Sequence, residues 1–480
     1  MKKAKTELYV EVNVPEKELK SFIQKAKDWA LINGISMRSK DPYSPNTLKI
    51  APFLLLPSTF PKKEFVKATE VQITLNELMH KVAHDHQFLT EVLKSTIEVD
   101  GFTEKLFRIY EAVYAEGFNQ KISLGLFRSD YMLHGDDDHK ILQVEFNTIA
   151  SSFAALACKI TEFHKYVLKD LGYSDKLKNI PENNAMSGFC RGLVCAWTLY
   201  GNDEAKMLFV VEGITYNICD QRFLEFGVQK LNPSIKIIRR SLGELVTQAK
   251  LGPNNELIVD DSIMSVVYFR SGYEVEAYPT EKEWAVRLMV ERSLAIKCPS
   301  IHYHLAGAKK VQQALALPGV VDRFLKDPNL VSKVTDVFTG LYGLDLDEKG
   351  DKAVAMAIET PRKFVLKPQR EGGGNNFYDD DVRIQLEKMK DSKERTGWIL
   401  MDRICPPPLK NILIRADSEE CVEAQDVITE LGIYGVIVGS ENEIKVNEQV
   451  GHLLRTKLSS SNEGGIVSGA GHIDSPYLLV

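Results

Sequence analysis

The stretch FVLKPQREGGGNNFY, residues 364–378, combines a lysine, a carboxylate and three consecutive glycines. The main-chain amides of glycines 372–374 have no side chains in the way, so an anionic group can approach the backbone closely. Lys367 adds a positive charge suited to phosphate, and Glu371 could hold a divalent cation against phosphate oxygens. The stretch has neither the Gly-Lys-Ser/Thr ending of a Walker A loop nor GxGxxG spacing. It predicts either a loop that covers phosphates or a flexible turn.

A second group of oxygen donors lies in ILQVEFNTIASSF, residues 141–153. Side chains of an extended strand alternate between faces, so Glu145 and Asn147 should point to one side while Val144 and Phe146 point into the core. The Cα atoms of Glu145 and Asn147 would lie about 6.5–7 Å apart, close enough for both side chains to bind one hard cation. The small residues that follow leave room for a ligand. The alternative is a half-buried strand with a polar outer face.

Arginines stand at the ends of several predicted strands. Arg128, in LGLFRSDYM, could bind a carboxylate through two hydrogen bonds or could pair with Asp130. Arg270, just before a glycine turn in VVYFRSGYE, suits an anionic substrate or a surface salt bridge. Arg455 and Lys457 are two positions apart, so an extended backbone would direct both toward one site.

Two further segments could contribute to binding. TYNICDQR, residues 215–222, supplies amide side chains suited to a peptide-like ligand after a strand. Near the C-terminus Glu463 precedes glycines 464 and 465, and an apolar strand candidate resumes at Ile466. This composition is compatible with a loop that closes over a ligand and with a flexible tail.

Pairs of histidines raise the question of a transition-metal site. His80 and His84 are four residues apart in a helical pattern, but HExxH is absent and Glu77 precedes both. We therefore expect a solvated helix face there. His302 and His304 lead to the same expectation, since no other ligands stand nearby.

Composition excludes several classes of protein. The 480 residues exceed what one core usually serves, so two or three substructures are expected. A formal charge of −6 argues against a general nucleic-acid binder. Seven scattered cysteines without CxxC favour reduced thiols over disulfides or zinc. The N-terminus lacks a signal-peptide pattern, and no window approaches 18 apolar residues. We expect a cytoplasmic protein without nucleic-acid or membrane partners.

Apolar periodicity predicts an α/β (α+β) fold with helices covering sheets. Strands are predicted at 141–147, 208–212, 265–269, 364–367, 398–401 and 432–438, and helices at about 15–30, 74–97, 101–117, 281–295, 307–316 and 379–390. Residues 206–305 have strand and helix content of their own and could form a subdomain. The turn-rich GLDLDEKGD, 343–351, could mark another unit that contains the glycine loop.

Together these features predict a nucleotide-dependent enzyme acting on a small anionic substrate. The chain resembles the eukaryotic glutathione synthetases, a family of ATP-grasp ligases, along nearly its whole length. The resemblance is carried by LGLFRSDYM, EFNTIASSF, NICDQR, VVYFRSGY, AIKCPS, LAGAKKVQQ, FVLKPQREGGGNN, ELGIYGV and GHLLRTK, in this order.

The resemblance implies an ATP-grasp core from 1–205 and 306–480 with a glycine-rich lid at about 343–415, and a substrate-binding subdomain at 206–305. It implies ligation of γ-glutamylcysteine with glycine. The terminal carboxylate of γ-glutamylcysteine attacks the γ-phosphorus of ATP, and the glycine amine then displaces phosphate from the acyl phosphate. Two Mg²⁺ ions per active site and a homodimer are also implied. A β-alanine-using, homoglutathione-type synthetase and a catalytically silent ATP-binding homologue are the alternatives.

Carried over by position, the resemblance also implies site residues. Arg128, Lys367 and Arg455 would be catalytic, and the metal ligands would be Glu145, Asn147 and Glu371. The ATP site would comprise Glu145, Lys309, Lys367, Pro368, Gln369, Arg370, Glu371, Gly372, Gly373, Gly374, Asn375, Asn376, Tyr378, Met401, Asp402, Arg403, Ile404, Glu430, Lys457 and Glu463. The peptide and acceptor contacts would be Arg128, Ile149, Ala150, Ser151, Ser152, Thr215, Tyr216, Asn217, Gln221, Arg270, Ser271, Gly272, Tyr273, Arg455, Ile466 and Val467.

Some positions depart from the usual pattern of the animal members of this family. Ala150 stands where a serine is usual, and Glu463 where an aspartate is usual. Thr215 and Tyr216 replace more polar or charged residues, which puts recognition of the γ-glutamyl group at that point in question. Ile466 and Val467 occupy the acceptor-side pair, at which β-alanine-using relatives differ.

Overall fold

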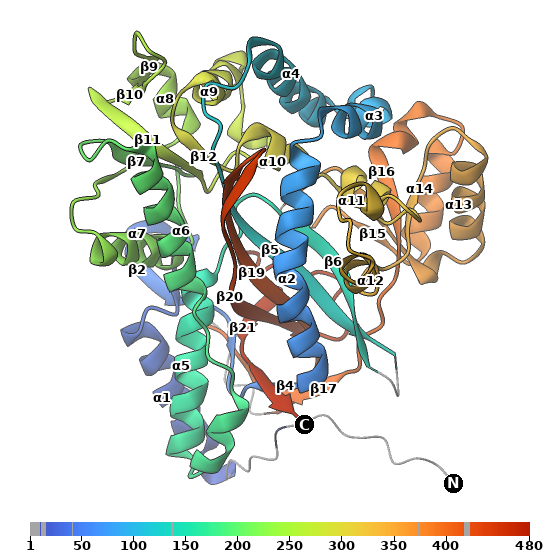
Figure 1. The fold of residues 1–480 in the computed structure, drawn as a ribbon. Coiled ribbons are helices and arrows are strands. Elements are labelled where there is room, and N and C mark those ends of the chain that lie inside the picture. Colours follow the sequence, from blue (N-terminus) through green and yellow to red (C-terminus); the bar gives the residue numbers. More distant parts are fainter. Residues whose placement is uncertain (1–9, 11–15, 41, 136–138, 372–373, 417–422) are drawn as a thin grey trace.

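The computed structural model describes residues 10, 16–40, 42–135, 139–371, 374–416 and 423–480. Its centre is a long, mostly antiparallel sheet whose strands come from distant parts of the chain (Figure 1). In spatial order the strands are β18 (Leu413–Ile414), β3 (Phe53–Leu54), β21 (Gly471–Asp474), β20 (Glu443–Leu458), β19 (Gln425–Ser440), β5 (Ser123–His134) and β6 (Lys140–Asn147), and β17 (Leu409–Asn411) also pairs with β19.

Helices cover both faces of the central sheet, α2 (Lys62–Ala83) on one face and α5 (Ala154–Asp170) and α6 (Ala185–Tyr200) on the other (Figure 1). The alternation of side chains along β19 explains how one strand serves both layers. Ile433 and Ile437 pack in one apolar cluster with α2, whereas Val436 and Val438 pack in a second cluster with α6. The middle of β19 is therefore apolar at nearly every position, as expected for a strand covered on both sides.

A second sheet is built from strands within residues 206–298, which follow α6. Its path is β8 (Ile237–Arg240), β7 (Lys206–Val210), β11 (Ser262–Phe269), β10 (Leu257–Val259) and β9 (Ala249–Leu251), with β12 (Ile296–Cys298) also paired to β11. Its helices are α7 (Ile218–Leu231), α8 (Leu242–Gln248) and α9 (Glu281–Arg292). Strands β8, β7, β11 and β12 run parallel, so their carboxyl ends meet at one edge.

A third, smaller sheet carries the segment that contains the first glycine loop. Its order is β13 (Leu341–Gly343), β16 (Trp398–Asp402), β14 (Phe364–Pro368) and β15 (Phe377–Tyr378), and it packs with α13 (Glu348–Glu359) and α14 (Asp380–Met389). Leu344, Leu366, Leu386 and Leu400 belong to an apolar cluster of this unit alone.

The other elements surround these sheets. They are α1 (Glu16–Ile32), β1 (Ser36–Lys40), β2 (Tyr43–Ile50), β4 (Ser58–Pro61), α3 (His86–Ile97), α4 (Gly101–Glu116), α10 (Ile301–Ala306), α11 (Lys309–Leu315), α12 (Pro328–Thr335), β22 (Pro476–Leu479) and 3₁₀ turns at Ser174–Asn179, Val275–Ala277, Val321–Arg323, Pro361–Lys363 and Lys393–Gly397. Within the described ranges, no helix combines the length and apolarity needed to cross a membrane.

The α/β class is confirmed, and each predicted strand from 141 to 438 overlaps an observed one. The single helix predicted at 74–97 is wrong. Two helices meet at His84 and Asp85, because the Asp85 side chain accepts a hydrogen bond from the amide of Phe88 at 2.9 Å and so starts α3. The strand expected from Ile466 is also wrong, since residues 466–469 form turns and β21 begins at Gly471.

The expectation of a solvated histidine face is wrong as well. His80 is only 2 % exposed, and its ring nitrogens bond to the Tyr303 hydroxyl and to the carbonyl oxygen of Ser440 at 3.0 Å. His302 and His304 are buried too. Helix α2 packs against α10, which places these rings in an interior layer. In the part of the chain that the structure describes, no group of three or more His, Cys, Asp or Glu side chains is arranged to hold a metal.

Candidate active site

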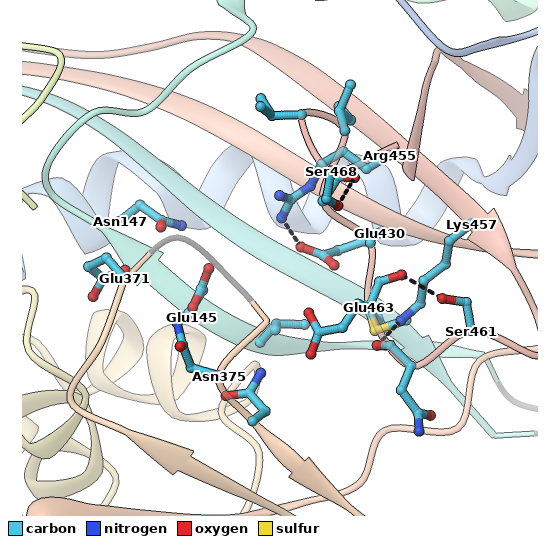
Figure 2. Close-up of a pocket in the computed structure, with 18 of the residues that line it drawn as sticks. Glu145, Asn147, Glu371, Asn375, Glu430, Arg455, Lys457, Ser461, Glu463 and Ser468 are labelled. Carbon is cyan, nitrogen blue, oxygen red and sulfur yellow. Dashed lines mark hydrogen bonds and ion pairs between the residues drawn. The ribbon is translucent and has the colours of Figure 1, made fainter. Parts of the chain in front are cut away.

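A cavity of about 1210 Å³ opens where the three sheets approach one another. Its walls come from β5, β6, β19 and β20 of the central sheet, from β14 and β16 of the small sheet, and from the segments after β7 and β11. The second glycine loop, residues 463–468, lines it as well. In Figure 2, Glu145, Asn147 and Glu371 form one group of side chains, and Glu430, Arg455 and Lys457 form a second group.

Two lysines and two glutamates cluster at the first group. Lys309, at the start of α11, lies 3.3 Å from Glu371 and 3.8 Å from Glu145. Lys367, on β14, donates to the carbonyl oxygen of Val144 at 3.0 Å. Three elements separated in sequence, β6, α11 and β14, therefore place opposite charges within a few ångströms.

Burial and charge act against each other in this cluster. Burial raises the pKa of Glu145, but Lys309 and Lys367 outweigh it and hold the pKa well below the ordinary value for glutamate. Burial also raises the pKa of Glu371, and there Lys309 does not fully compensate. Burial lowers the pKa of Lys367, whereas the two carboxylates raise that of Lys309. Such opposed shifts are typical of functional sites.

Oxygen atoms suited to a divalent cation face this part of the cavity. The Asn147 amide nitrogen donates to Asp130 at 3.0 Å, which leaves its carbonyl oxygen for the cavity. Glu145 and Glu371 add carboxylate oxygens. Two carboxylates and an amide oxygen are too few for a closed protein cage, but they fit Mg²⁺, which is usually bound by one or two carboxylates together with substrate phosphates.

Asp130 connects the metal-facing group to the arginines. It is fully buried and pairs with Arg128 through two hydrogen bonds, at 2.6 and 2.7 Å. Arg455 reaches the same carboxylate at 3.0 Å and also pairs with Glu430 on the neighbouring strand. The expected pairing of Arg128 with Asp130 is therefore observed, and Arg128 also lines the cavity, so that binding of a carboxylate there stays a prediction.

The loop after β6 is held by the second sheet. Ala150 and Phe153 have φ angles of 51° and 71°, a left-handed conformation that non-glycine residues rarely adopt. Asp220 accepts hydrogen bonds from the amides of Phe153, Ala155 and Leu156 at 2.8, 3.0 and 3.3 Å. Arg270 donates to the carbonyl oxygen of Ala150 at 3.2 Å. Residues 149–153 thus line the cavity in a defined conformation.

The two glycine-containing loops meet over the cavity. The Glu463 carboxylate accepts a hydrogen bond from the amide of Gly374 at 2.9 Å. Arg403 donates to the Asn462 side chain at 3.1 Å, and Lys457 donates to the Asn462 carbonyl oxygen. Residues 372 and 373 lie outside the described part of the chain.

Most of the site residues expected from the sequence share this cavity. Those that line it are Arg128, Glu145, Asn147, Ile149, Ala150, Ser151, Ser152, Tyr216, Asn217, Arg270, Tyr273, Lys309, Lys367, Arg370, Glu371, Asn375, Asn376, Tyr378, Met401, Arg403, Ile404, Glu430, Arg455, Lys457, Glu463, Ile466 and Val467. Phe146 is buried as expected, but Val144 is half-buried and lines the cavity rather than the core.

Other expected residues do not line the cavity, and these are Thr215, Gln221, Ser271, Gly272, Pro368, Gln369, Gly374 and Asp402. Arg239 donates to the Thr215 hydroxyl at 3.3 Å and to the Gln221 side chain at 2.7 Å, which holds both away from the cavity. Pro368 and Asp402 follow lining residues on their strands and so face the other side of the small sheet.

Several lining residues were not found by sequence reasoning, among them Lys40, Glu212, Glu274, Arg362 and Cys405. Glu212 could have been found from the sequence, because it ends the predicted strand 208–212 and ligands often bind at the carboxyl ends of parallel strands. Lys40 could not, since it lies on a hairpin that reaches the cavity only through the tertiary fold.

Comparison with known proteins agrees with this geometry. Residues 16–478 match the family model for the eukaryotic glutathione synthase, ATP binding domain. The glutathione synthetase of Xenopus laevis is 43 % identical, covering 98 % of this chain and 100 % of that protein. The glutathione synthetase of Homo sapiens is 41 % identical over 96 % of this chain and 97 % of its own length.

A solved structure shows the same fold. A glutathione synthetase-like effector from Globodera pallida, in its apo form, superposes with a TM-score of 0.78 at 24 % identity, covering 97 % of this chain and 98 % of that one. The extent of the family match and of the identity to the vertebrate enzymes goes well beyond a shared fold. This chain belongs to the eukaryotic glutathione synthase family.

Proposed function

We propose that this protein is a glutathione synthetase, an ATP-dependent ligase that joins γ-glutamylcysteine to glycine and releases ADP and phosphate. The observation that carries the proposal is the cluster of Lys309 and Lys367 with Glu145 and Glu371, which lie 3.8 and 3.3 Å from Lys309, inside a cavity that Arg455 also lines. Family membership supports the same activity.

The lysine side of the cavity would bind ATP. Lys309 and Lys367 offset phosphate charge, and the strand β14 leads directly into the glycine loop. Glu145, Asn147 and Glu371 would hold Mg²⁺, with two ions proposed per site. When bound, the ions would neutralise charge on the phosphates.

The arginine side would bind the peptide. Arg128 and Arg455 would hold the terminal carboxylate of γ-glutamylcysteine so that one of its oxygens faces the γ-phosphorus of ATP. Attack breaks the bond to the ADP oxygen and forms an acyl phosphate. The glycine amine then adds to the acyl carbon, loses a proton and expels phosphate. Protein groups only position and neutralise charge here, so no enzyme nucleophile is needed.

Exclusion of water would come from the two loops. An acyl phosphate hydrolyses if water reaches it, so the contact between Glu463 and Gly374 would keep both loops over the reacting atoms. Ile466 is buried and Val467 is partly exposed at the cavity wall, where they would border the acceptor.

We propose a domain organisation for the whole protein on the basis of the family resemblance. Residues 1–205 and 306–480 would form the ATP-grasp core, with a lid at about 343–415, and 206–305 would form the substrate-binding subdomain. We also propose a cytoplasmic homodimer that acts on small molecules without nucleic-acid or membrane partners.

The deciding assay measures ADP release from ATP with γ-glutamylcysteine, adding glycine or β-alanine separately. We expect release that requires γ-glutamylcysteine and is strongly stimulated by glycine. Preference for β-alanine would assign the homoglutathione reaction instead. ADP release that ignores both acceptors would contradict a ligase.

A further inference from the structure

We propose that Glu212 is a specificity residue that binds the α-ammonium group of the γ-glutamyl donor, next to Arg270, which binds the α-carboxylate. This inference rests on the proposed function, because it concerns recognition of the same substrate. It assigns a direct substrate contact to a residue that the family resemblance did not include.

Glu212 and Arg270 lie at the ends of two adjacent parallel strands. Val210 on β7 pairs with Phe269 on β11, and the amides of Arg270 and Ser271 both donate to the Val210 carbonyl oxygen, at 2.8 and 3.1 Å. These bonds hold the two strand ends together just before their charged side chains. Both Glu212 and Arg270 line the cavity. Open α/β sheets usually bind ligands at this edge.

The acceptor atoms at this edge are oriented by neighbours. Gln221 donates to one Glu212 carboxylate oxygen at 3.2 Å. Asn217 donates through its amide nitrogen to Asp220 at 3.4 Å. The other Asn217 atom, its carbonyl oxygen, is buried and has no hydrogen-bond partner in the described part of the chain, although the residue lines the cavity. A buried acceptor without a donor is costly unless a ligand supplies one.

The chemistry of these groups matches an α-amino acid head group. An ammonium group has three N–H donors, and Glu212 together with the Asn217 oxygen offers acceptors for them. The Arg270 guanidinium keeps its charge, since its neighbours Tyr268 and Glu212 outweigh the effect of burial and raise its pKa. It can therefore bind the α-carboxylate. The far end of the donor would then extend toward Arg128 and Arg455.

Position 215 cannot supply this negative charge. Thr215 is buried, donates its hydroxyl to the Glu212 carbonyl oxygen at 3.3 Å and accepts from Arg239. It therefore faces the scaffold, while Glu212 faces the substrate space. The presence of Thr215, where the animal members of the family have a more polar or charged residue, is thus compatible with recognition of a γ-glutamyl group.

The test compares two substrates on two proteins. The substrates are γ-glutamylcysteine and glutarylcysteine, which lacks only the α-amino group, and the proteins are the wild type and Glu212→Gln. Hydrogen bonds to charged groups predict that removing the amino group raises the wild-type KM about tenfold or more. For Glu212→Gln we expect the KM for γ-glutamylcysteine to rise by a similar factor. With this variant, the KM values for γ-glutamylcysteine and glutarylcysteine should differ by no more than about twofold. The kcat and the KM for ATP should stay near wild type.

A matched control is Glu276→Gln, an exposed glutamate in the 3₁₀ turn after β11 that does not line the cavity. It should keep the wild-type preference for the amino group. If Glu212→Gln discriminates the two substrates as strongly as the wild type, the assignment of Glu212 is overturned while the ligase function stands. If the wild type releases no ADP with γ-glutamylcysteine and glycine, the proposed function itself has failed.

Discussion

At the scale of single residues, Asp130 links the groups that the chemistry needs. This carboxylate is fully buried, and Arg128, Arg455 and Asn147 all donate to it. Two catalytic candidates and one metal-ligand candidate therefore share one acceptor. A neutral side chain at this position would leave the buried Arg128 and the partly buried Arg455 poorly compensated.

We expect Asp130→Asn to lower the kcat for ADP release more than tenfold, and to lower the free energy of unfolding by about 3–5 kcal/mol, the usual cost of breaking a buried pair. Enzyme kinetics and urea denaturation measure the two effects. Glu291→Gln is the control, because it breaks the buried pair with Arg287, 2.9 Å apart, outside the cavity. It should lose stability without losing kcat. Normal turnover in folded Asp130→Asn would contradict the role of Asp130.

Glu371→Gln tests the metal-facing group. It removes a charge beside Lys309 without changing size, so we expect turnover at saturating Mg²⁺ to fall at least a hundredfold, about 2.7 kcal/mol of transition-state stabilisation. The circular dichroism spectrum and Tm should stay close to wild type. Glu387→Gln, on the exposed face of α14, should leave turnover unchanged. Full activity of Glu371→Gln would remove Glu371 from the site.

The sequence was most informative about individual site residues. Lys367 and Glu371 stood out because glycines follow them, and Arg455 because Lys457 is two positions away. Glu212 and Lys40 were missed, since a lone charge next to an apolar run looks the same whether it faces water or a cavity. Thr215 and Gln221 were expected at the site, but Arg239 holds them behind its wall.

At the scale of elements, the start of α5 determines the shape of the substrate loop. Asp220, in the first turn of α7, accepts hydrogen bonds from three amides at that start. One helix thereby holds the N-terminus of another, and the left-handed residues Ala150 and Phe153 are kept in place between β6 and α5. Strain of this kind persists only where neighbours enforce it.

Asp220→Asn should weaken this anchoring, because one carboxylate oxygen is replaced by an amide nitrogen that cannot accept. We expect the KM for γ-glutamylcysteine to rise several-fold and stability to fall by about 1–3 kcal/mol. Steady-state kinetics and denaturation check both. Asp100→Asn, which alters the cap that bonds to Thr103 at 2.8 Å, should change stability alone. An unchanged KM in Asp220→Asn would show that the loop holds its shape without this anchor.

Element positions were predicted better than element boundaries. Strands such as β6 and β14 were found because apolar runs are short and rich in branched residues. The break between α2 and α3 was missed, because Leu89 and Leu93 continue the helical spacing of α2 and mask the cap at Asp85. The apolar residues after Gly465 suggested a strand, but Ile466 packs into the core from a turn.

At the scale of the whole molecule, the cavity exists only because three sheets come together. Pairing of β5 with β19 joins residues about three hundred positions apart, such as Arg128 and Tyr434. No local pattern contains that information, and the order of strands in the central sheet was not predictable without the family resemblance. The resemblance supplied the grouping of residues, and the tertiary pairing explains it.

Buried histidines make global stability depend on pH. Burial lowers the pKa of His80 and His472 to about 4 and of His164 and His452 to about 3, and it also lowers the pKa of His84, His302 and His304. In the unfolded chain they titrate near 6.5. The unfolded state then binds more protons between about pH 6.5 and 4, so stability is lost as pH falls through this range. Burial raises the pKa of Asp474 to about 7, so the contribution of this group to stability is lost as pH rises instead.

We therefore expect Tm to decrease steadily from pH 7 to pH 5. His452→Leu removes one such group, so the dependence of unfolding free energy on pH should flatten by up to about 1.4 kcal/mol per pH unit. Denaturant unfolding at several pH values measures the slope. This account would be contradicted if the unfolding free energy of His452→Leu depended on pH as steeply as that of the wild type. A wild-type Tm that rises on acidification would contradict it as well.

The pairing of β19 with β20 has a consequence for how genes of this family can change length. Glu430 pairs with Arg455, and Lys457 shares the face of Arg455 because a strand repeats every two residues. One added codon just before Arg455 would turn both cations to the opposite face while every site residue is still encoded. Insertions are tolerable instead in turns such as 252–256, between β9 and β10, so divergence in length should collect there and spare β20.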